Sequence, residues 1–212
     1  MDRQSWWLDE AAYAGAEHLD AGYIADYGAK ARYDPAEDLE RLRAFGLGAE
    51  STVVDIGAGT GVFALAMAAE AGRVIAVDIS PAMCRLMRER ATESDASNVT
   101  VFEAGFLTYA GEPDSADFVF SRNALHQIPD FWKVVALRRI HDLLKPGGVL
   151  RLRDLVYDID PSRVADRVSR WVSGGVEDPS LGYTADLAEH VRTEHAHSAG
   201  CSTRCSTRQG SR

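Results

Sequence analysis

The feature that most constrains this chain is a β-branched run leading directly into a glycine-rich turn. Residues 53–64 read Val-Val-Asp-Ile-Gly-Ala-Gly-Thr-Gly-Val-Phe-Ala. Glycines have no side chains, so the backbone N–H groups of such a turn can approach a ligand closely at the start of the following helix. The spacing Gly-x-Gly-x-Gly differs from the Gly-x-Gly-x-x-Gly of dinucleotide-binding turns, and no Gly-Lys-Ser/Thr follows. The sequence therefore predicts a ligand-binding strand–turn–helix unit that is not a phosphate-cradling P-loop.

Beyond residue 51, short apolar runs alternate with segments of helical length and periodicity. This alternation predicts an α/β fold, a Rossmann-like three-layer sandwich whose mostly parallel sheet is covered by helices on both faces. Its ligand crevice is expected outside the carboxyl ends of the strands. We expect strands at 52–56, 73–78, 99–103, 116–121 and 148–153, and helices at 61–71, 82–94, 131–144, 160–173 and 184–195.

The first fifty residues read as a helical cap that precedes the sheet. They are rich in Ala, Glu and Asp, and Asp34-Pro35 is a typical helix start, because Asp caps well and Pro suits the first helical position. The composition turns to Ser, Thr, Arg, Gly and Cys near the end of the chain. We therefore expect a helical cap at 1–50, an α/β domain at 51–197 and a tail at 198–212.

An acid at the end of the second predicted strand adds information about the ligand. Asp78 lies seventeen residues after Gly61. A carboxylate at that strand end can accept hydrogen bonds from both hydroxyls of a ribose. NAD and S-adenosylmethionine share that ribose, so Asp78 indicates an adenosine ligand without identifying it.

Several motifs, taken in order over residues 51–155, resemble the class I S-adenosylmethionine-dependent methyltransferases. The turn Leu-Lys-Pro-Gly-Gly at 144–148, combined with the glycine loop, is a specific pairing. Residues 17–20 and 27–30 are also similar to a bacterial subgroup of the small-molecule type. The segments that resemble family motifs are 53–61 (first motif), 77–83 (ribose and adenine segment), 117–130 (fourth strand and loop) and 143–150 (turn into the fifth strand).

This resemblance implies S-adenosyl-L-methionine as cofactor. A small-molecule acceptor is expected largely by elimination, because no Asn/Asp-Pro-Pro-Tyr follows the fourth predicted strand and the chain has no Pro-Cys nucleophile. No metal site is expected. Many family members bind the adenine amino group with an acid at the end of the third strand, where this chain has Ala104-Gly105-Phe106. The resemblance then leaves adenine to the Phe106 backbone and to apolar contact with Met83. The implied cofactor-binding residues are Asp55, Gly57, Ala58, Gly59, Gly61, Asp78, Ile79, Met83, Gly105, Phe106 and Asn123.

Methyl transfer from a sulfonium is an in-line displacement that mainly needs positioning and exclusion of water. A general base is required only when the nucleophile starts protonated. His126 follows the fourth predicted strand and is the candidate catalytic residue; the alternative is a loop histidine bonded to backbone. Tyr23, Tyr27 and Lys30 either cover the crevice or pack the cap against the sheet.

Charge and composition exclude several classes of partner. Thirty-two acids against 23 Lys plus Arg give a formal charge of -9 without a basic cluster, so no nucleic-acid partner is expected. No apolar run approaches the roughly 20 residues of a membrane span. The expected location is cytoplasmic. Two alternatives to a methyltransferase stay open, an NAD(P)-dependent oxidoreductase of similar fold and an inactive cofactor-binding remnant.

The tail contains the repeat Cys-Ser-Thr-Arg at 201–204 and 205–208. A zinc site from His195, His197, Cys201 and Cys205 is disfavoured, because this spacing is not a usual structural one. Read in a shifted frame, the repeat permits an apolar pair every four residues, a helical pattern. We interpret the tail as a frameshift near His195, which predicts that the final strands of the sheet are missing and that one sheet edge is exposed.

Overall fold

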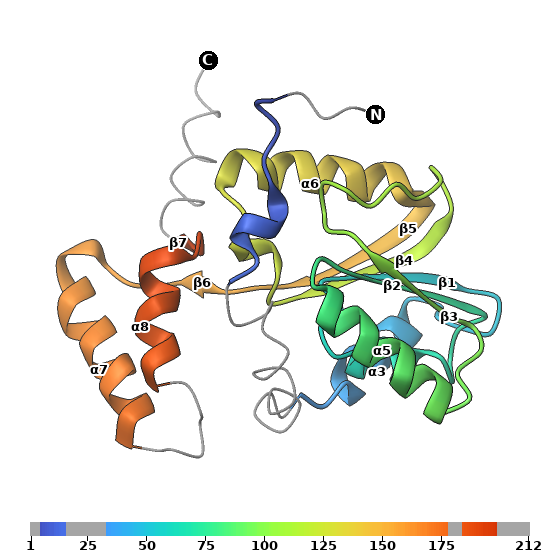
Figure 1. The fold of residues 1–212 in the computed structure, drawn as a ribbon, viewed down its shortest axis with the longest axis horizontal. Coiled ribbons are helices and arrows are strands. Elements are labelled where there is room, and N and C mark those ends of the chain that lie inside the picture. Colours follow the sequence, from blue (N-terminus) through green and yellow to red (C-terminus); the bar gives the residue numbers. More distant parts are fainter. Residues whose placement is uncertain (1–4, 16–32, 178–183, 199–212) are drawn as a thin grey trace. The chain divides into compact units, whose positions relative to one another are not determined.

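A computed structural model describes residues 5–15, 33–177 and 184–198 of the chain (Figure 1). The chain divides into two units, residues 1–153 and residues 154–212, each described here by itself. The predicted helical positions Tyr23, Tyr27 and Lys30, and the tail from residue 199 onward, lie outside the described residues. The expected boundaries at residues 50 and 197 stay predictions.

The first unit is built on a five-stranded sheet in the order β3-β2-β1-β4-β5 (Figure 1). All four neighbouring pairs are parallel. Such a sheet is buried on both faces, which explains its near-continuous apolar sequences. The strands are β1 Thr52–Ile56, β2 Arg73–Asp78, β3 Val99–Glu103, β4 Ala116–Arg122 and β5 Leu144–Arg153.

Helices cover both faces of this sheet, which confirms the predicted Rossmann-like α/β fold. On one face α6 packs with the N-terminal segment, and on the other lie α3, α4 and α5 (Figure 1). The α-helices are α3 Ala36–Ala44, α4 Val62–Met67, α5 Pro81–Glu93 and α6 Asp130–Leu143, and the short 3-10 turns are η1 Glu10–Tyr13 and η2 Leu125–Gln127.

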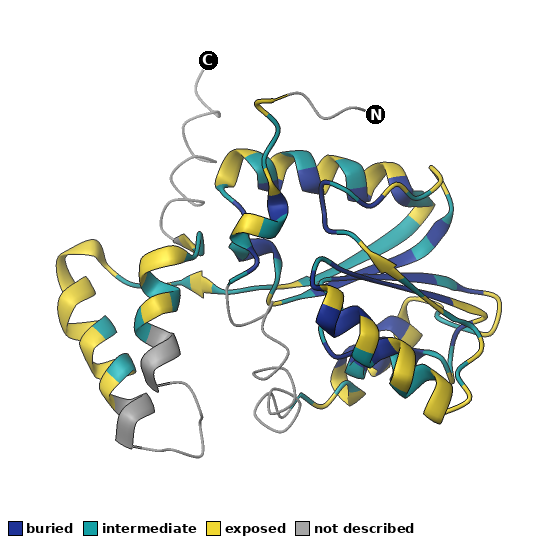
Figure 2. Ribbon diagram, viewed as in Figure 1, coloured by how far each residue is buried: buried dark blue, intermediate teal, exposed yellow. Residues whose placement is uncertain are grey.

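The core consists of two apolar clusters separated by the sheet. Val54 and Val119 point to the α6 side, whereas Val53 and Phe120 point to the α3–α5 side. Successive side chains of a strand point to opposite faces, so each central strand contributes to both clusters. Figure 2 shows the buried residues concentrated along β1, β2 and β4 and on the sheet-facing sides of α5 and α6.

Two elements differ in length from the expected ones. Helix α4 ends at Met67 instead of continuing to residue 71. The Asn98 side-chain amide donates to the carbonyls of Ala68 and Ala71, both at 2.9 Å, and so satisfies backbone acceptors that lie beyond the end of the helix. Strand β5 begins at Leu144 rather than at residue 148. Its pairing with β4 is irregular, since Ala116 pairs with Leu144 and Phe118 with Val149, so the glycine turn lies within the strand.

The second unit consists of short strands and helices. Strands β6 Val156–Tyr157 and β7 His197–Ser198 pair in parallel. The two helices predicted here are confirmed with shifted ends, as α7 Val164–Glu177, which follows the turn η3 Pro161–Arg163, and α8 Thr184–Thr193. No helix in the described part of the chain is both long and apolar enough to span a membrane.

Candidate functional site

The turn after β1 is anchored to the neighbouring strand. The N–H groups of Gly57 and Ala58 donate to the carbonyl of Val77 at 2.8 and 3.0 Å. The Gly61 N–H donates to the carbonyl of Ala58 at 3.0 Å, which closes the turn just before α4. The predicted glycine loop therefore exists as a tight strand-to-helix connection at the carboxyl edge of the sheet.

Glycine is required at two positions of this turn for reasons of space. Gly57 has φ +77°, and a Cβ atom there would lie 2.4 Å from the Ala124 Cβ. Gly61 has φ +81°, and a Cβ atom there would lie 2.7 Å from the Met87 side chain. Gly59 differs, because its Cβ would meet nothing within 4 Å. The middle of the loop thus faces open space in which a ligand can approach the backbone.

Asp78 holds the glycine loop at the end of β2. Its Oδ2 atom accepts from the Gly59 N–H at 2.7 Å, and its Oδ1 atom accepts from the Ser80 N–H at 2.8 Å. Ser80 in turn caps α5 by accepting from the Met83 N–H at 3.2 Å. An ionised carboxylate has about four acceptor sites, so a carboxylate in this place can accept from backbone N–H groups and from hydroxyl groups at the same time.

Asp55 is a buried carboxylate behind the same loop, with only 1% of its surface exposed. Its Oδ2 atom has no hydrogen-bond partner among the described residues. Burial, and then the negative charge of Asp78, raise the pKa of the Asp55 carboxyl well above its usual range. A buried acceptor without a partner is costly, and a cationic N–H donor from a ligand would satisfy it.

The loop after β3 is held from several sides. The Gly105 N–H donates to the Thr108 hydroxyl at 2.7 Å. The Arg139 guanidinium, from α6, donates to the carbonyls of Phe106 and Tyr109 at 3.1 and 2.6 Å. Among the predicted cofactor contacts, Phe106 and Met83 are buried and Ile79 is partly buried. All three side chains are apolar.

Glu10 reaches this loop and was not found from the sequence. It lies on η1 and is 4% exposed. Its Oε2 atom accepts from the Leu107 N–H at 3.0 Å, across 97 positions of the chain. No local pattern marks such a long-range contact.

The loop after β4 carries the two remaining predicted residues. Asn123 is exposed, has φ +50°, and donates its N–H to the carbonyl of Arg153 at 2.8 Å. His126 lies on η2 and is 3% exposed. The structure therefore leaves Asn123 exposed, directly after the carboxyl end of β4, and buries the His126 side chain.

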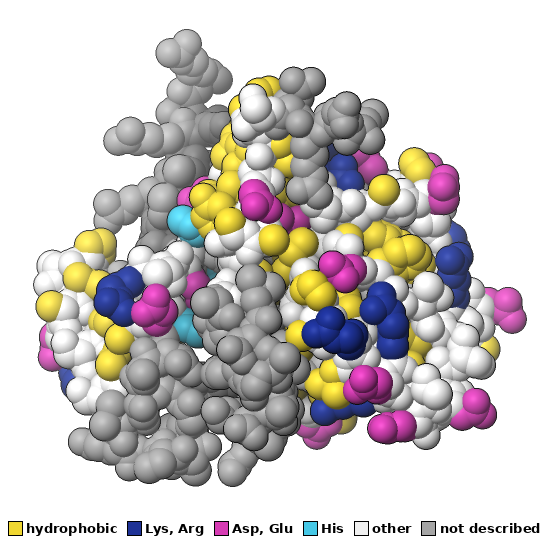
Figure 3. Space-filling view, viewed as in Figure 1, with side chains coloured by type: hydrophobic (Ala, Val, Ile, Leu, Met, Phe, Trp, Pro, Cys, Tyr) yellow, Lys and Arg dark blue, Asp and Glu magenta, His cyan; other side chains and the backbone are white. Residues whose placement is uncertain are grey.

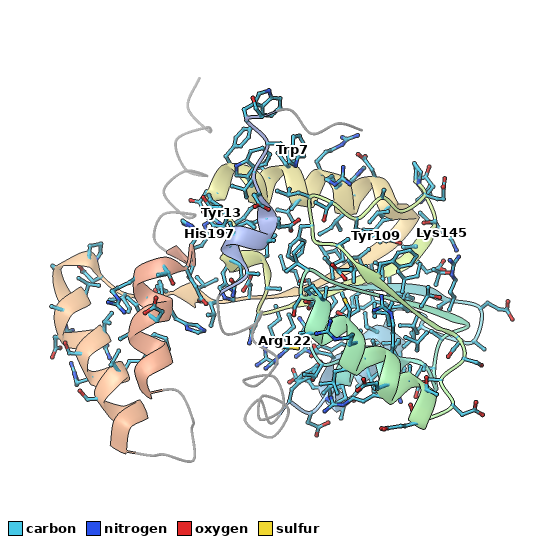
Figure 4. The ribbon with its side chains drawn as sticks, viewed as in Figure 1. Trp7, Tyr13, Tyr109, Arg122, Lys145 and His197 are labelled. Atoms are coloured by element: carbon cyan, nitrogen blue, oxygen red, sulfur yellow. The ribbon has the colours of Figure 1, made fainter. Side chains whose placement is uncertain are left out.

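A second polar cluster, also missed by the sequence, surrounds Tyr33. The Tyr33 hydroxyl donates to Asp38 at 2.8 Å, and Arg151 forms an ion pair with the same carboxylate at 2.7 Å. Burial, together with the hydrogen bond to Asp38, raises the pKa of Tyr33 above its usual range. Arg122, at the carboxyl end of β4 (Figure 4), lies 4.1 Å from the Tyr33 ring centroid.

Arg122 has one further property. Its Nε atom is buried without a hydrogen-bond partner in the part of the chain that the structure describes. A guanidinium at a strand end is suited to bind a planar carboxylate or a phosphate. The sequence carries a signal for this residue, because Arg122 ends an apolar strand whose carboxyl end lies at the expected ligand crevice.

Comparison with known proteins identifies relatives of this region. Residues 53–148 match the family described as "Methyltransferase domain". Phosphoethanolamine N-methyltransferase 2 of Caenorhabditis elegans is 38% identical over 114 residues, which cover 53% of this chain and 26% of that protein. Demethylmenaquinone methyltransferase of Listeria monocytogenes is 33% identical over 107 residues, or 49% of this chain and 44% of that protein. The chain thus spans less than half the length of these relatives.

Solved structures show the same similarity. Phosphoethanolamine N-methyltransferase 2 of Haemonchus contortus, in complex with phosphomonomethylethanolamine and S-adenosylhomocysteine, has a TM-score of 0.61 and 28% identity. The similarity covers 77% of this chain and 40% of that one. The YcgJ protein of Bacillus subtilis has a TM-score of 0.57 and 26% identity over 78% of this chain and 63% of that one.

Proposed function

We propose that this chain, whose residues 53–148 match the methyltransferase domain family, methylates a small-molecule acceptor with S-adenosylmethionine as the methyl donor. The observation that carries the proposal is the bond from the Gly59 N–H to the Asp78 carboxylate, 2.7 Å long. This bond joins the glycine loop after β1 to Asp78, the acid that can accept from ribose hydroxyls. The loop and Asp78 thus lie next to each other at the carboxyl ends of β1 and β2.

The residues of this edge fit S-adenosylmethionine. Asp55, whose buried Oδ2 atom has no hydrogen-bond partner among the described residues, would receive the amino group of the methionyl part. The backbone from Gly57 through Ala58 and Gly59 to Gly61 would lie along the cofactor, and Asp78 would accept from the ribose hydroxyls. Ile79, Met83, Gly105, Phe106 and Asn123 would line the remaining surface.

When bound, the cofactor supplies an electrophilic methyl group on a sulfonium, so the protein's task is placement of the acceptor and exclusion of water. The fixed loops after β1 and β3 suit this task, because their backbones are held by the hydrogen bonds described above. His126 is proposed to take a proton from an acceptor that starts protonated.

A small-molecule acceptor is favoured by the relatives, whose names give phosphoethanolamine and demethylmenaquinone as substrates. These relatives are all methyltransferases, so nothing in them favours the oxidoreductase alternative. On the face seen in Figure 3, Lys and Arg side chains are interspersed with Asp and Glu over the first unit. The expectations of no nucleic-acid partner and of a cytoplasmic location stay predictions.

Thermal unfolding with and without S-adenosylhomocysteine tests the cofactor site. A ligand at about a hundredfold over its dissociation constant adds about 2.7 kcal/mol to the folded state, if it binds that state alone. For a chain of this size we expect Tm to rise by roughly 5–10 °C. Asp78→Ala should remove the rise. NADH serves as the control ligand, and a rise with NADH alone would support the oxidoreductase.

Turnover is tested separately, by release of S-adenosylhomocysteine from S-adenosylmethionine in the presence of small amines, phenols and quinols. We expect one acceptor class to stimulate release in the wild type and not in Asp78→Ala. Cofactor binding without release for any acceptor would support the inactive remnant instead.

A further inference from the structure

The end of β3 lies where the base of a bound adenosine is expected. The sheet order places β2 between β1 and β3, and Asp78 pairs in register with Glu103. A nucleoside that meets the glycine loop at β1 and Asp78 at β2 therefore continues toward the 104–108 loop. This region must supply the groups that distinguish adenine from other bases.

Adenine carries an exocyclic amino group at position 6, which needs a hydrogen-bond acceptor. In this loop Ala104, Gly105, Phe106 and Leu107 have no side-chain acceptor, and the Thr108 hydroxyl already accepts from the Gly105 N–H. Glu103 is exposed at the last position of β3. The acceptor must come either from that exposed acid or from another part of the chain.

The Glu10 carboxyl group occupies the space that a side chain at position 105 would fill. A Cβ atom built on Gly105 would lie 2.3 Å from the Cδ atom of Glu10 and 2.4 Å from each of its carboxylate oxygens. Two side chains cannot share that volume. A chain with Glu10 in this position therefore requires glycine at 105, and the acid enters from a different segment.

Contacts on both sides fix Glu10 in this place. The Trp7 ring packs edge-on against Trp132 of α6, with ring centroids 5.1 Å apart, and Figure 4 shows Trp7 beside that helix. Leu8 and Tyr13 pack against the same apolar cluster. The loop is anchored from α6 by Arg139. The segment that carries Glu10 and the loop that it contacts are thus both packed against α6.

A buried carboxylate is costly unless several donors satisfy it. The Glu10 Oε2 atom accepts from the Leu107 N–H at 3.0 Å and lies 3.5 Å from the Thr108 hydroxyl. A carboxylate has about four acceptor sites, so a carboxyl group in this place can accept from more than one N–H or O–H donor at a time. The amino group of adenine is such a donor.

We propose that the Glu10 carboxylate accepts a hydrogen bond from the 6-amino group of the cofactor's adenine. The N-terminal segment would thereby provide a specificity-determining residue that the β3 loop lacks. This proposal rests on the proposed function, because it assumes that S-adenosylmethionine binds at the glycine loop and Asp78.

The test compares S-adenosylhomocysteine with S-inosylhomocysteine, in which a 6-oxo group replaces the 6-amino group. Isothermal titration of the full chain should show that the wild type prefers the amino ligand by roughly 10- to 100-fold, as expected for one charged hydrogen bond. Glu10→Gln keeps the size of the side chain but offers an amide that can also donate. We expect it to reduce the preference at least about tenfold.

Glu103→Gln is the matched control, because it changes the exposed acid at the end of β3 in the same way. It should leave the preference unchanged. If Glu103→Gln removes the preference and Glu10→Gln does not, the acid of β3 reads the base and the proposal is wrong.

A position exchange separates recognition from folding. Gly105→Asp alone should lower Tm, because its Cβ would collide with Glu10. Glu10→Ala should lose the preference, and the double variant Glu10→Ala/Gly105→Asp should regain it. A regained preference for the 6-amino ligand would show that a carboxylate in this volume recognises adenine, whichever segment provides it.

Three outcomes overturn the proposal. An unchanged preference in Glu10→Gln with a native-like Tm would do so. Equal weakening of both ligands would show that Glu10 only holds the loop. Failure of the wild type to bind S-adenosylhomocysteine would overturn the proposed function together with this inference, whereas the first two outcomes leave the proposed function intact.

Discussion

The Asp78 carboxylate accepts a hydrogen bond from the Gly59 N–H at 2.7 Å, across 19 positions of the chain. The bond links the turn after β1 to the end of β2, two features that the sequence presents as separate motifs. The same carboxylate accepts from the Ser80 N–H at the start of α5. One side chain therefore fixes the positions of two loops that border the proposed cofactor site.

Replacing Asp78 by Asn should impair both folding and binding. The amide keeps the shape but presents an NH₂ group toward one of two backbone N–H donors. We expect a loss of about 1–3 kcal/mol in the free energy of unfolding and at least a tenfold weaker affinity for S-adenosylhomocysteine. Urea unfolding and isothermal titration measure these two quantities. Asp95→Asn, at an exposed position, is the control; equal effects of the two variants would contradict the role of Asp78.

Gly57→Ala should destabilise the protein for two separable reasons. The backbone has φ +77°, which costs a side-chain-bearing residue roughly 1–2 kcal/mol. The new Cβ would also collide with the Ala124 Cβ, at 2.4 Å, and overpacking of this kind costs about 1–3 kcal/mol. Thermal or urea unfolding should show the sum of both losses.

Gly46→Ala isolates the backbone part of that effect, because Gly46 has φ +95° and open space around it. Ala124→Gly should relieve the collision when it is combined with Gly57→Ala. A double-mutant cycle that shows no coupling between positions 57 and 124 would rule out the steric explanation.

The buried Asp55 carboxyl should make stability depend on pH in an unusual direction. Its folded-state pKa is raised above the unfolded value of about 3.8, first by burial and then by the charge of Asp78. The folded state therefore keeps a proton that the unfolded state has already released, and this contribution to stability is lost as pH rises through the folded pKa. Asp55→Asn should remove the loss, so its advantage in unfolding free energy over the wild type should grow from acid to neutral pH.

Urea unfolding of Asp55→Asn and wild type at several pH values checks this dependence. Asp114→Asn, at an exposed position, provides a control with the same change of charge. An advantage that stays constant with pH would contradict the assignment. Because Asp55 is also proposed to bind the cofactor's amino group, the stabilised variant should bind S-adenosylhomocysteine more weakly.

The Asp38 carboxylate should be among the most sensitive polar positions of the first unit. It is 1% exposed and is shared by Arg151 and the Tyr33 hydroxyl. Asp38→Asn leaves a partly buried guanidinium without its counter-charge, so we expect a loss of about 3–5 kcal/mol. Glu37→Gln breaks an exposed ion pair with Arg41 on the same helix and should cost less than about 0.5 kcal/mol. Similar losses in both variants by urea unfolding would refute the role of burial.

The sheet was predictable because its information is local. β-branched runs such as that of β1 and helices of regular periodicity carry their own signal. The glycine loop and Asp78 were predictable for the same reason, since each follows directly from a strand end. The two-residue strands β6 and β7 are too short to show any periodicity, and the irregular start of β5 depends on its pairing with β4.

Long-range polar contacts were not predictable. Glu10 meets Leu107 across 97 positions and Arg151 meets Asp38 across 113. In the sequence, Glu10 and Asp38 resemble the exposed acids of helical segments, because no neighbouring residue indicates that they are buried. The burial of His126 also depends on tertiary packing of η2, and its catalytic role stays a prediction.

The ion pair between Asp38 and Arg151 has a consequence for the size of the smallest fragment that folds. Asp38 precedes the family-matched residues 53–148, and Arg151 follows them. A fragment cut to the matched residues would lose both partners together with Leu39 and Leu42, which are buried in the core. We therefore expect the smallest stable fragment to extend at least from Tyr33 to Arg153, and limited proteolysis should leave this span intact.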